Sequence, residues 1–127
     1  MYEEFVKWLD SLLDKNMPFK GAKGICFNLY EEGDDEWSVQ LVATSRFDMD
    51  DDDWACDETW SSEEDLYIWK EKATWEDIQS EASGWVMEYL ESGKHAEEFN
   101  PYEGLGVGFV DGDITLFLHE DAKNTIA

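Results

Sequence analysis

The sequence contains few basic residues: nine lysines and arginines stand against 32 aspartates and glutamates, which gives a formal net charge of −23 at pH 7. Contacts with nucleic-acid phosphates and with anionic membrane surfaces both depend on clustered Lys and Arg. The scarcity therefore excludes nucleic acid and a membrane surface as direct partners. Such a negative field favours encounter with a cationic protein or with metal cations instead.

Cysteine and long apolar runs are scarce as well. Cys26 and Cys56 are the two cysteines of the chain, which is too few for a disulfide framework. The N-terminal residues lack the basic start and apolar core of a signal peptide, and no apolar run approaches the ~20 residues that span a bilayer. We therefore expect a cytoplasmic protein with both thiols free. No feature of the sequence indicates an oligomeric state.

Aromatic residues are abundant in spite of the charge, with seven Trp and seven Phe among 127 residues. Disordered acidic chains are usually poor in aromatics, so the composition predicts a folded chain. The length corresponds to one domain, which buries roughly two-thirds of its unfolded surface. We expect a single domain over residues 1–127, in which residues 119–127 form a frayed tail.

Apolar periodicity predicts the secondary structure. Residues 2–15 form an amphipathic helix, and a second helix begins at Thr74, whose hydroxyl can cap the first turn, and ends at Gly93. Alternating residues at 23–30 and 37–47 predict a hairpin. Further strands are expected at 66–69, 104–110 and 113–118.

These elements predict an α+β domain of two layers with the order α-β-β-(β)-α-β-β. Because each strand pair is joined locally, the sheet of four to five strands should be antiparallel, with both helices on one face. Asp111-Gly112 indicates a two-residue turn in the last hairpin, which would place Phe109 opposite Ile114. The glycines that alternate within residues 104–108 leave room on one sheet face, either for close packing or for a shallow partner groove.

The most informative segment lies between Arg46 and Lys70, where no basic residue occurs and ten carboxylates fall between Asp48 and Asp65. We expect this segment to be irregular. An EF-hand loop would need a Gly at its sixth position and a Glu at its twelfth, and no register supplies both. The sequence therefore predicts no dedicated metal site.

Catalytic motifs are missing from the remaining sequence. His95 and His119 lie outside every nucleophile, zinc and Cys-His pattern, and we expect both to face solvent. No pair of carboxylates stands out as an acid and base. We therefore predict no catalytic residue, no cofactor and no enzymatic activity.

The acidic segment is a better candidate for binding a protein. Its carboxylates would steer a cationic partner, and its tryptophans would anchor it, since Trp is enriched at interface hot spots. The alternative is a solvated loop whose tryptophans pack onto the core. The predicted partner-binding residues are Asp50, Asp51, Asp52, Asp53, Trp54, Asp57, Glu58 and Trp60.

A small, acidic α+β chain with no catalytic motif and an aromatic-bearing carboxylate surface at Asp48–Asp65 resembles the immunity proteins that bacteria encode beside polymorphic or contact-dependent toxins. The resemblance is one of overall pattern, so it assigns no residues. It implies a cytoplasmic protein that covers the active site of a cognate toxin, often a basic nuclease.

The sequence thus predicts a non-enzymatic acidic protein that sequesters a basic protein partner, most concretely an immunity protein that neutralises a toxin such as a nuclease. A nuclease must present Lys and Arg to nucleic acid, and clustered carboxylates can bind the same groups. A divalent-cation-binding protein or carboxylate-dependent enzyme is the alternative from another class. A regulatory interaction module without a toxin partner is the third.

Overall fold

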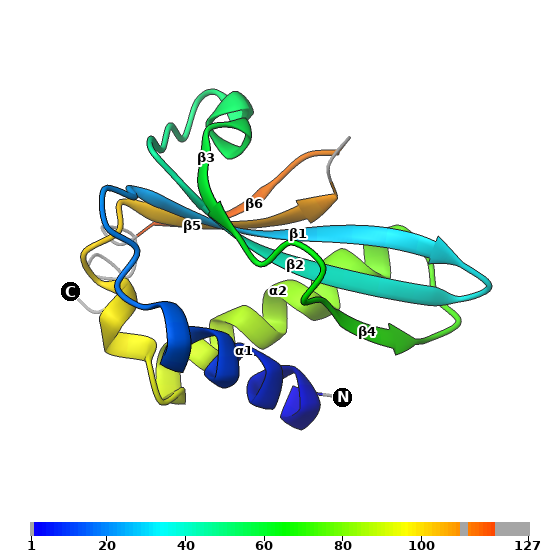
Figure 1. Ribbon diagram of the computed structural model, residues 1–127. Helices are drawn as coiled ribbons and strands as arrows, with labels where there is room; N and C mark the ends of the chain where they lie inside the picture. Colours follow the sequence, from blue (N-terminus) through cyan, green and yellow to red (C-terminus); the bar gives the residue numbers. More distant parts are fainter. Residues whose placement is uncertain (1, 110–111, 119–127) are drawn as a thin grey trace.

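Both helices lie on the same face of a twisted sheet (Figure 1). The computed structural model describes residues 2–109 and 112–118, without the side chains of residues 52 and 118. Asp111 of the predicted turn, His119 and the tail predicted at residues 119–127 lie outside this part of the chain. The described residues form a small α+β domain, as the sequence predicts.

The elements follow one another as α1 (Tyr2–Asn16), β1 (Gly24–Gly33), β2 (Glu36–Thr44), the 3-10 helix η1 (Asp52–Cys56), β3 (Glu58–Ser61), β4 (Tyr67–Lys70), α2 (Trp75–Ser92), the 3-10 helix η2 (Ala96–Phe99), β5 (Gly104–Phe109) and β6 (Thr115–Leu118). The short third strand is confirmed as β4. The segment expected to be irregular contains both η1 and β3, which brings the sheet to six strands.

The strands are ordered β3-β2-β1-β5-β6, and β4 pairs with β2 beside β3. All pairs are antiparallel except β1 and β5, which are parallel. The sheet is therefore mostly antiparallel. The exception arises because α2 carries the chain back beneath the sheet, so that the last hairpin enters beside β1 in the same direction.

The main core lies between the helices and the inner face of the sheet. The alternation predicted for β1 is confirmed, since Ile25, Phe27 and Leu29 all face this core and are at most 1% exposed. The helices contribute their apolar stripes, with Phe5, Leu9, Leu12 and Leu13 from α1 and Ile78, Ala82, Trp85, Val86 and Tyr89 from α2.

A second, smaller apolar cluster covers one end of the outer sheet face. It consists of Cys26, Val42 and Trp54, with Phe47, Ala55, Ile114 and Leu116 packed against them. The sequence does not predict this cluster. It covers apolar side chains on the outer face of β1, β2 and β6.

The pairing predicted for the last hairpin is wrong by one residue. Leu105 lies opposite Phe117 and Gly106 lies opposite Leu116, whereas a two-residue turn would place Gly106 opposite Phe117. A shift of one residue turns every side chain of a strand to the other face. Leu116 therefore faces the outer cluster, because the pairing of β5 with β6 is shifted by one residue from the pairing that the Asp111-Gly112 turn predicts.

Candidate partner-binding surface

The acidic segment has a defined structure. The side chain of Asp51 caps η1 by accepting a hydrogen bond from the amide of Asp53 at 3.0 Å, and Asp48 Oδ1 accepts one from the amide of Asp50 at 2.9 Å. Short polar side chains favour such local turns, because they satisfy amides that a 3-10 helix leaves free. Part of the carboxylate run therefore shapes its own backbone.

Trp54 fastens this segment to the sheet. Its side chain is 0% exposed, and its ring centroid lies 4.7 Å from that of Phe47. The prediction of Trp54 as an exposed anchor is wrong, because the ring fills the outer cluster. Sequence spacing could not indicate this, since the ring lies against the bare backbone of Gly24 on β1 and Gly106 on β5, which are both distant from η1 along the chain.

Of the two possibilities for the glycines of β5, the structure shows close packing, in which aromatic rings fill the space beside Gly104 and Gly106. A Cβ at Gly104 would come within 2.3 Å of the Phe47 ring, and one at Gly106 within 3.0 Å of the Trp54 ring. Neither position could hold a larger residue without moving the cluster. These glycines position η1 on the sheet.

Trp60 also faces inward. On β3 it pairs with Ala43 of β2, and its ring centroid is 4.7 Å from that of Phe19. The side chain is partly exposed and packs against the main core. The alternative in which the two tryptophans pack onto the core is therefore confirmed for Trp54, which is fully buried. Trp60 also packs against the core but is only partly buried.

The predicted charge partners are divided between exposed and paired groups. Asp50, Asp53 and Glu58 are exposed. Asp57 is half-buried and accepts a hydrogen bond from Arg46, which also lies 4.0 Å from the exposed Asp51. The hydrogen bond to Asp57 raises the pKa of the Arg46 guanidinium, against a smaller opposing effect of burial. The side chain of residue 52 lies outside the described atoms.

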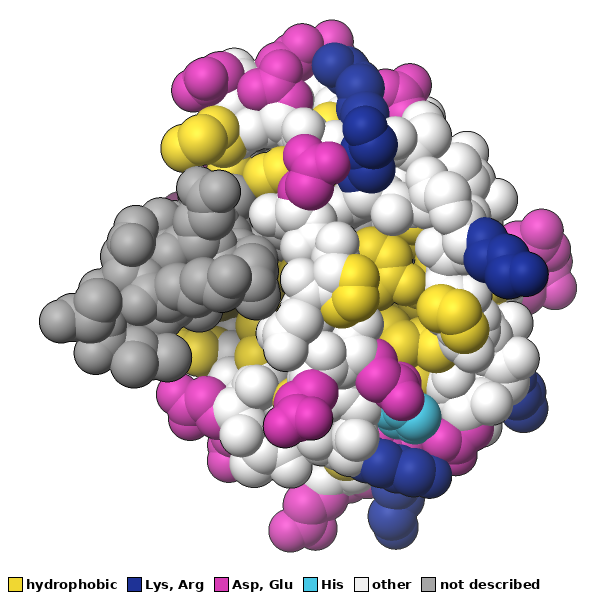
Figure 2. Space-filling view, turned by 90° about the vertical axis from the view of Figure 1, so that its left-hand side faces the viewer, with side chains coloured by type: hydrophobic (Ala, Val, Ile, Leu, Met, Phe, Trp, Pro, Cys, Tyr) yellow, Lys and Arg dark blue, Asp and Glu magenta, His cyan; other side chains and the backbone are white. Residues whose placement is uncertain are grey.

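An exposed apolar side chain does stand within the acidic segment, but it is Met49, which is 58% exposed. In the space-filling view, Asp and Glu side chains cluster at the top of the molecule, where η1 lies in Figure 1, with a basic side chain beside them (Figure 2). Met is a flexible residue that is common at binding surfaces. Its place next to Asp48 and Asp50 is visible in the sequence, but its exposure is not.

Beside η1, the outer sheet face carries polar residues. Tyr30 donates a hydrogen bond to Gln40 at 3.0 Å, and Ser38 donates one to Glu32 at 2.8 Å. Burial raises the pKa of Tyr30, and the nearby charges of Glu58 and Glu32 raise it further. Glu32 and Glu58 therefore lie close enough to Tyr30 to influence its titration.

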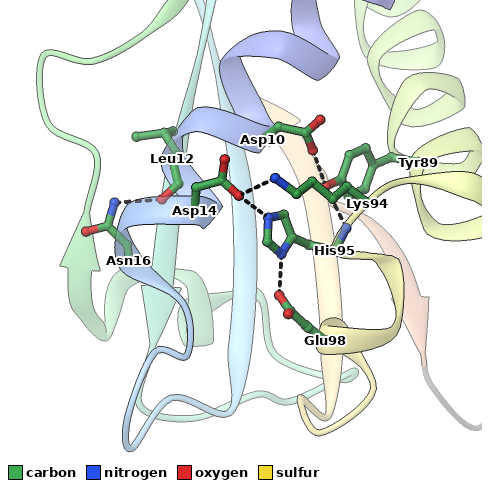
Figure 3. Close-up of polar contacts among 8 residues, drawn as sticks. All are labelled: Asp10, Leu12, Asp14, Asn16, Tyr89, Lys94, His95 and Glu98. Atoms are coloured by element: carbon green, nitrogen blue, oxygen red, sulfur yellow. Dashed lines mark hydrogen bonds and ion pairs between the residues drawn. The ribbon is translucent and has the colours of Figure 1, made fainter.

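His95 does not face solvent as predicted. Its side chain is 11% exposed, and its ring nitrogens contact two carboxylates: Nε2 lies 2.7 Å from Asp14 Oδ1, and Nδ1 lies beside Glu98 Oε2 (Figure 3). Lys94 Nζ lies 2.9 Å from the same Asp14 oxygen. Burial lowers the pKa of His95, but the two carboxylates outweigh burial and leave the pKa raised.

Tyr89 adds two more hydrogen bonds to the contacts between α1 and the residues after α2. Tyr89 donates a hydrogen bond to Asp10 Oδ1 at 2.6 Å and accepts one from the amide of His95 at 3.1 Å (Figure 3). Burial and the hydrogen bond to Asp10 raise the pKa of Tyr89. The arrangement joins α1 to the residues that follow α2, so we assign it a structural role.

Among the described residues, no group of three or more His, Cys, Asp and Glu side chains has the geometry of a metal site. Over the same residues, neither helix has an apolar stretch of the length that crosses a bilayer.

Comparison with protein-family models, with curated protein sequences and with solved structures gives no match to this chain. A function for this chain is therefore inferred from the geometry and the charge of its surface.

Proposed function

We propose that this chain is a non-enzymatic acidic binding protein that sequesters a basic protein partner, most concretely a cytoplasmic immunity protein that neutralises a co-encoded toxin such as a nuclease. The observation that supports the proposal best is the attachment of η1 to the sheet through the buried Trp54. Carboxylates held on a folded platform lose little conformational entropy when they bind. A flexible acidic loop would lose more.

The electrostatics support the same partner class. The net charge of −23 would accelerate encounter with a cationic protein, and rapid association suits the neutralisation of a toxic enzyme. Among the predicted acids whose side chains the structure describes, Asp50, Asp53 and Glu58 are exposed and not paired with Arg46. We assign these three the main contacts with Lys and Arg of the partner.

The test is association with basic proteins encoded next to this chain. We expect a nanomolar complex whose association rate falls steeply between low and physiological salt. Failure to bind every basic neighbour would refute the proposal. Calorimetry with Ca²⁺, Mg²⁺ and Mn²⁺ examines the alternative of a cation-binding protein, which tight stoichiometric binding would favour.

A matched pair of variants locates the surface. The triple variant Asp50→Asn, Asp53→Asn and Glu58→Gln removes three charges near η1, and the control Glu3→Gln, Glu88→Gln and Glu91→Gln removes three from the exposed helix surface. Net charge changes equally in both. We expect the first variant to slow association at least about threefold more than the control. Equal rates would place the interface elsewhere.

A further inference from the structure

The imidazole ring of His95 lies between two carboxylates that belong to different parts of the chain. Asp14 is in the last turn of α1, whereas Glu98 is in η2, three residues after the histidine (Figure 3). Nε2 of the ring lies 2.7 Å from Asp14 Oδ1, and Nδ1 lies beside Glu98 Oε2. The ring therefore joins the end of α1 to η2.

Both of these contacts require a positively charged ring. An ionised carboxylate only accepts hydrogen bonds, so each ring nitrogen that contacts one must carry a proton. Neutral imidazole carries one such proton, and imidazolium carries two. The side chain of His95 is 11% exposed, so water has little access to replace a donor that is lost. The arrangement in this structure is therefore that of the protonated histidine.

Asp14 keeps a second donor when the ring loses a proton. Lys94 Nζ lies 2.9 Å from the same Asp14 oxygen. The hydrogen bond from Lys94, followed by that from His95, lowers the pKa of Asp14, so this carboxylate stays ionised where histidine titrates. The other titratable pair beside the ring is Tyr89 and Asp10, whose hydroxyl and carboxylate are bonded to each other at 2.6 Å.

Glu98 has no comparable second donor. Among the described residues, His95 is the only hydrogen-bond partner of the Glu98 carboxylate. Access to water does not distinguish the two acids, since the side chains of Asp14 and Glu98 are 46% and 53% exposed. The proton of a neutral ring is held best by the carboxylate that lacks another donor, which places it on Nδ1. Nε2 then turns a lone pair toward Asp14 Oδ1, and the contact between α1 and η2 is lost.

The segment that this contact fastens carries part of the core. Phe99 of η2 is 3% exposed and packs edge-on against Tyr89, with ring centroids 6.2 Å apart. Beyond η2, the hydroxyl of Tyr102 accepts a hydrogen bond from the amide of Phe19 at 2.9 Å. A short element that is attached by a few side chains can open locally while the sheet stays folded. Loss of the contact with Asp14 therefore loosens the end of α1 without unfolding the domain.

We propose that His95 is a pH switch between α1 and η2, closed while the imidazole donates to both Asp14 and Glu98 and open once the Nε2 proton has left to solvent. Burial lowers the pKa of His95, and the two carboxylates outweigh burial and raise it above 6.5. The switch is therefore fully closed below the unfolded pKa and opens as the pH rises through the folded pKa. The switch does not involve η1 and is independent of the proposed function.

The first test follows the ring and the end of α1 together by NMR. The full chain is titrated from about pH 5 to about pH 9, which brackets the titration of histidine. We expect ¹⁵N shifts of two protonated ring nitrogens at low pH and of the Nδ1–H form at high pH. A neutral ring that is protonated at Nε2 would overturn the proposal.

In the same samples, the amide of Met17 reports the last turn of α1, because it donates to the backbone oxygen of Leu13 at 3.1 Å. After correction for the intrinsic effect of pH, its protection from hydrogen exchange should fall at least about twofold through the titration of the ring. Protection that does not follow the ring titration would contradict the switch.

Two isosteric variants distinguish a switch from an ordinary ion pair. Asp14→Asn and Glu98→Gln change the net charge equally, and both sites are about half exposed, so both variants should stay folded. Glu98→Gln removes the competing carboxylate, so the neutral ring keeps its proton toward Asp14 and the protection of Met17 no longer falls. Asp14→Asn removes the acceptor on α1, so the protection is low at every pH. Equal behaviour of the two variants would refute the proposal.

A third variant excludes another titrating group. The pKa of Glu81 is raised to about 7, so Glu81 titrates in the same range as the ring. His95→Gln removes the imidazole and leaves Glu81 in place. We expect the corrected protection of Met17 to become independent of pH in this variant. A pH dependence that persists would assign the opening to Glu81 and would show that the switch at His95 is wrong.

Discussion

The indole ring of Trp54 lies directly on the backbone of Gly24, so that a Cβ at residue 24 would come within 2.8 Å of the ring. This contact joins η1 to β1. It holds the acidic segment against the sheet. The stability of the surface proposed to bind the partner therefore depends on residues that the surface does not display.

Gly24→Ala should destabilise the fold by about 1–3 kcal/mol, because the added methyl overpacks a buried aromatic ring. The free energy of unfolding in urea measures the effect. Gly84→Ala is the matched control, since its added methyl meets open space in the middle of α2. The control should stabilise the protein by about 0.5–1 kcal/mol. If both variants change stability in the same direction, the contact has been misassigned.

Two substitutions of Trp54 separate the contribution of ring packing to stability from that of a hydrogen bond at Nε1. Trp54→Ala should cost about 3–5 kcal/mol, because it leaves a cavity in the outer cluster. Trp54→Phe should cost much less, since Trp54 Nε1 is buried without an acceptor among the described residues and its removal leaves no partner behind. Urea denaturation compares the two. A phenylalanine variant as unstable as the alanine variant would show that Nε1 has a partner.

His95 predicts a pH dependence. Its pKa is raised above the ordinary 6.5 in the folded state, so the imidazolium form stabilises the fold. This contribution is complete below the unfolded pKa and is lost as the pH rises through the folded pKa. His95→Gln should therefore lower the free energy of unfolding by about 1 kcal/mol relative to the parent chain at pH 5.5, and by less at pH 8.5. An NMR titration that gives a His95 pKa below 6.5 would contradict the assignment.

Glu81 should act in the same direction. Burial, and the hydrogen bond that protonated Glu81 donates to the Glu71 carboxylate, raise the pKa of Glu81 to about 7. Its contribution to stability is complete below its unfolded pKa of 4.5 and is lost as the pH rises through about 7. Glu81→Gln should therefore stabilise the protein at pH 8 by about 1–2 kcal/mol, measured by urea denaturation, and have little effect at pH 4.5. A stabilisation that is independent of pH would show that the pKa of Glu81 is not raised in the folded state.

Ionic strength should raise the melting temperature. A chain with a net charge of −23 repels itself in the folded state, and salt screens that repulsion over about 10 Å at 0.1 M. We expect Tm to increase by several degrees between 10 mM and 300 mM NaCl. Calorimetry at pH 7 measures the shift, and a Tm independent of salt would show that the charges are too far apart to matter.

The predictions made from sequence succeeded where the signal was local. The stripe at Phe5, Leu9 and Leu12 and the cap at Thr74 are properties of neighbouring residues, and both helices are present. The cap is seen as a hydrogen bond from the amide of Asp77 to Thr74 Oγ1. The register of the last hairpin failed because β6 has apolar side chains on both faces, with Leu116 in the outer cluster and Phe117 against the main core, so alternation could not indicate which side of β6 faces the helices.

By itself, the sequence determined the excess of carboxylates, their concentration between Asp48 and Asp65, and the α+β class, because charge and periodicity are properties of the chain. Only the tertiary structure decided that Trp54 lies inside and Met49 outside. The reason is that the space for Trp54 is made by Gly24 and Gly106, which are distant in sequence and adjacent only once β1 and β5 have paired.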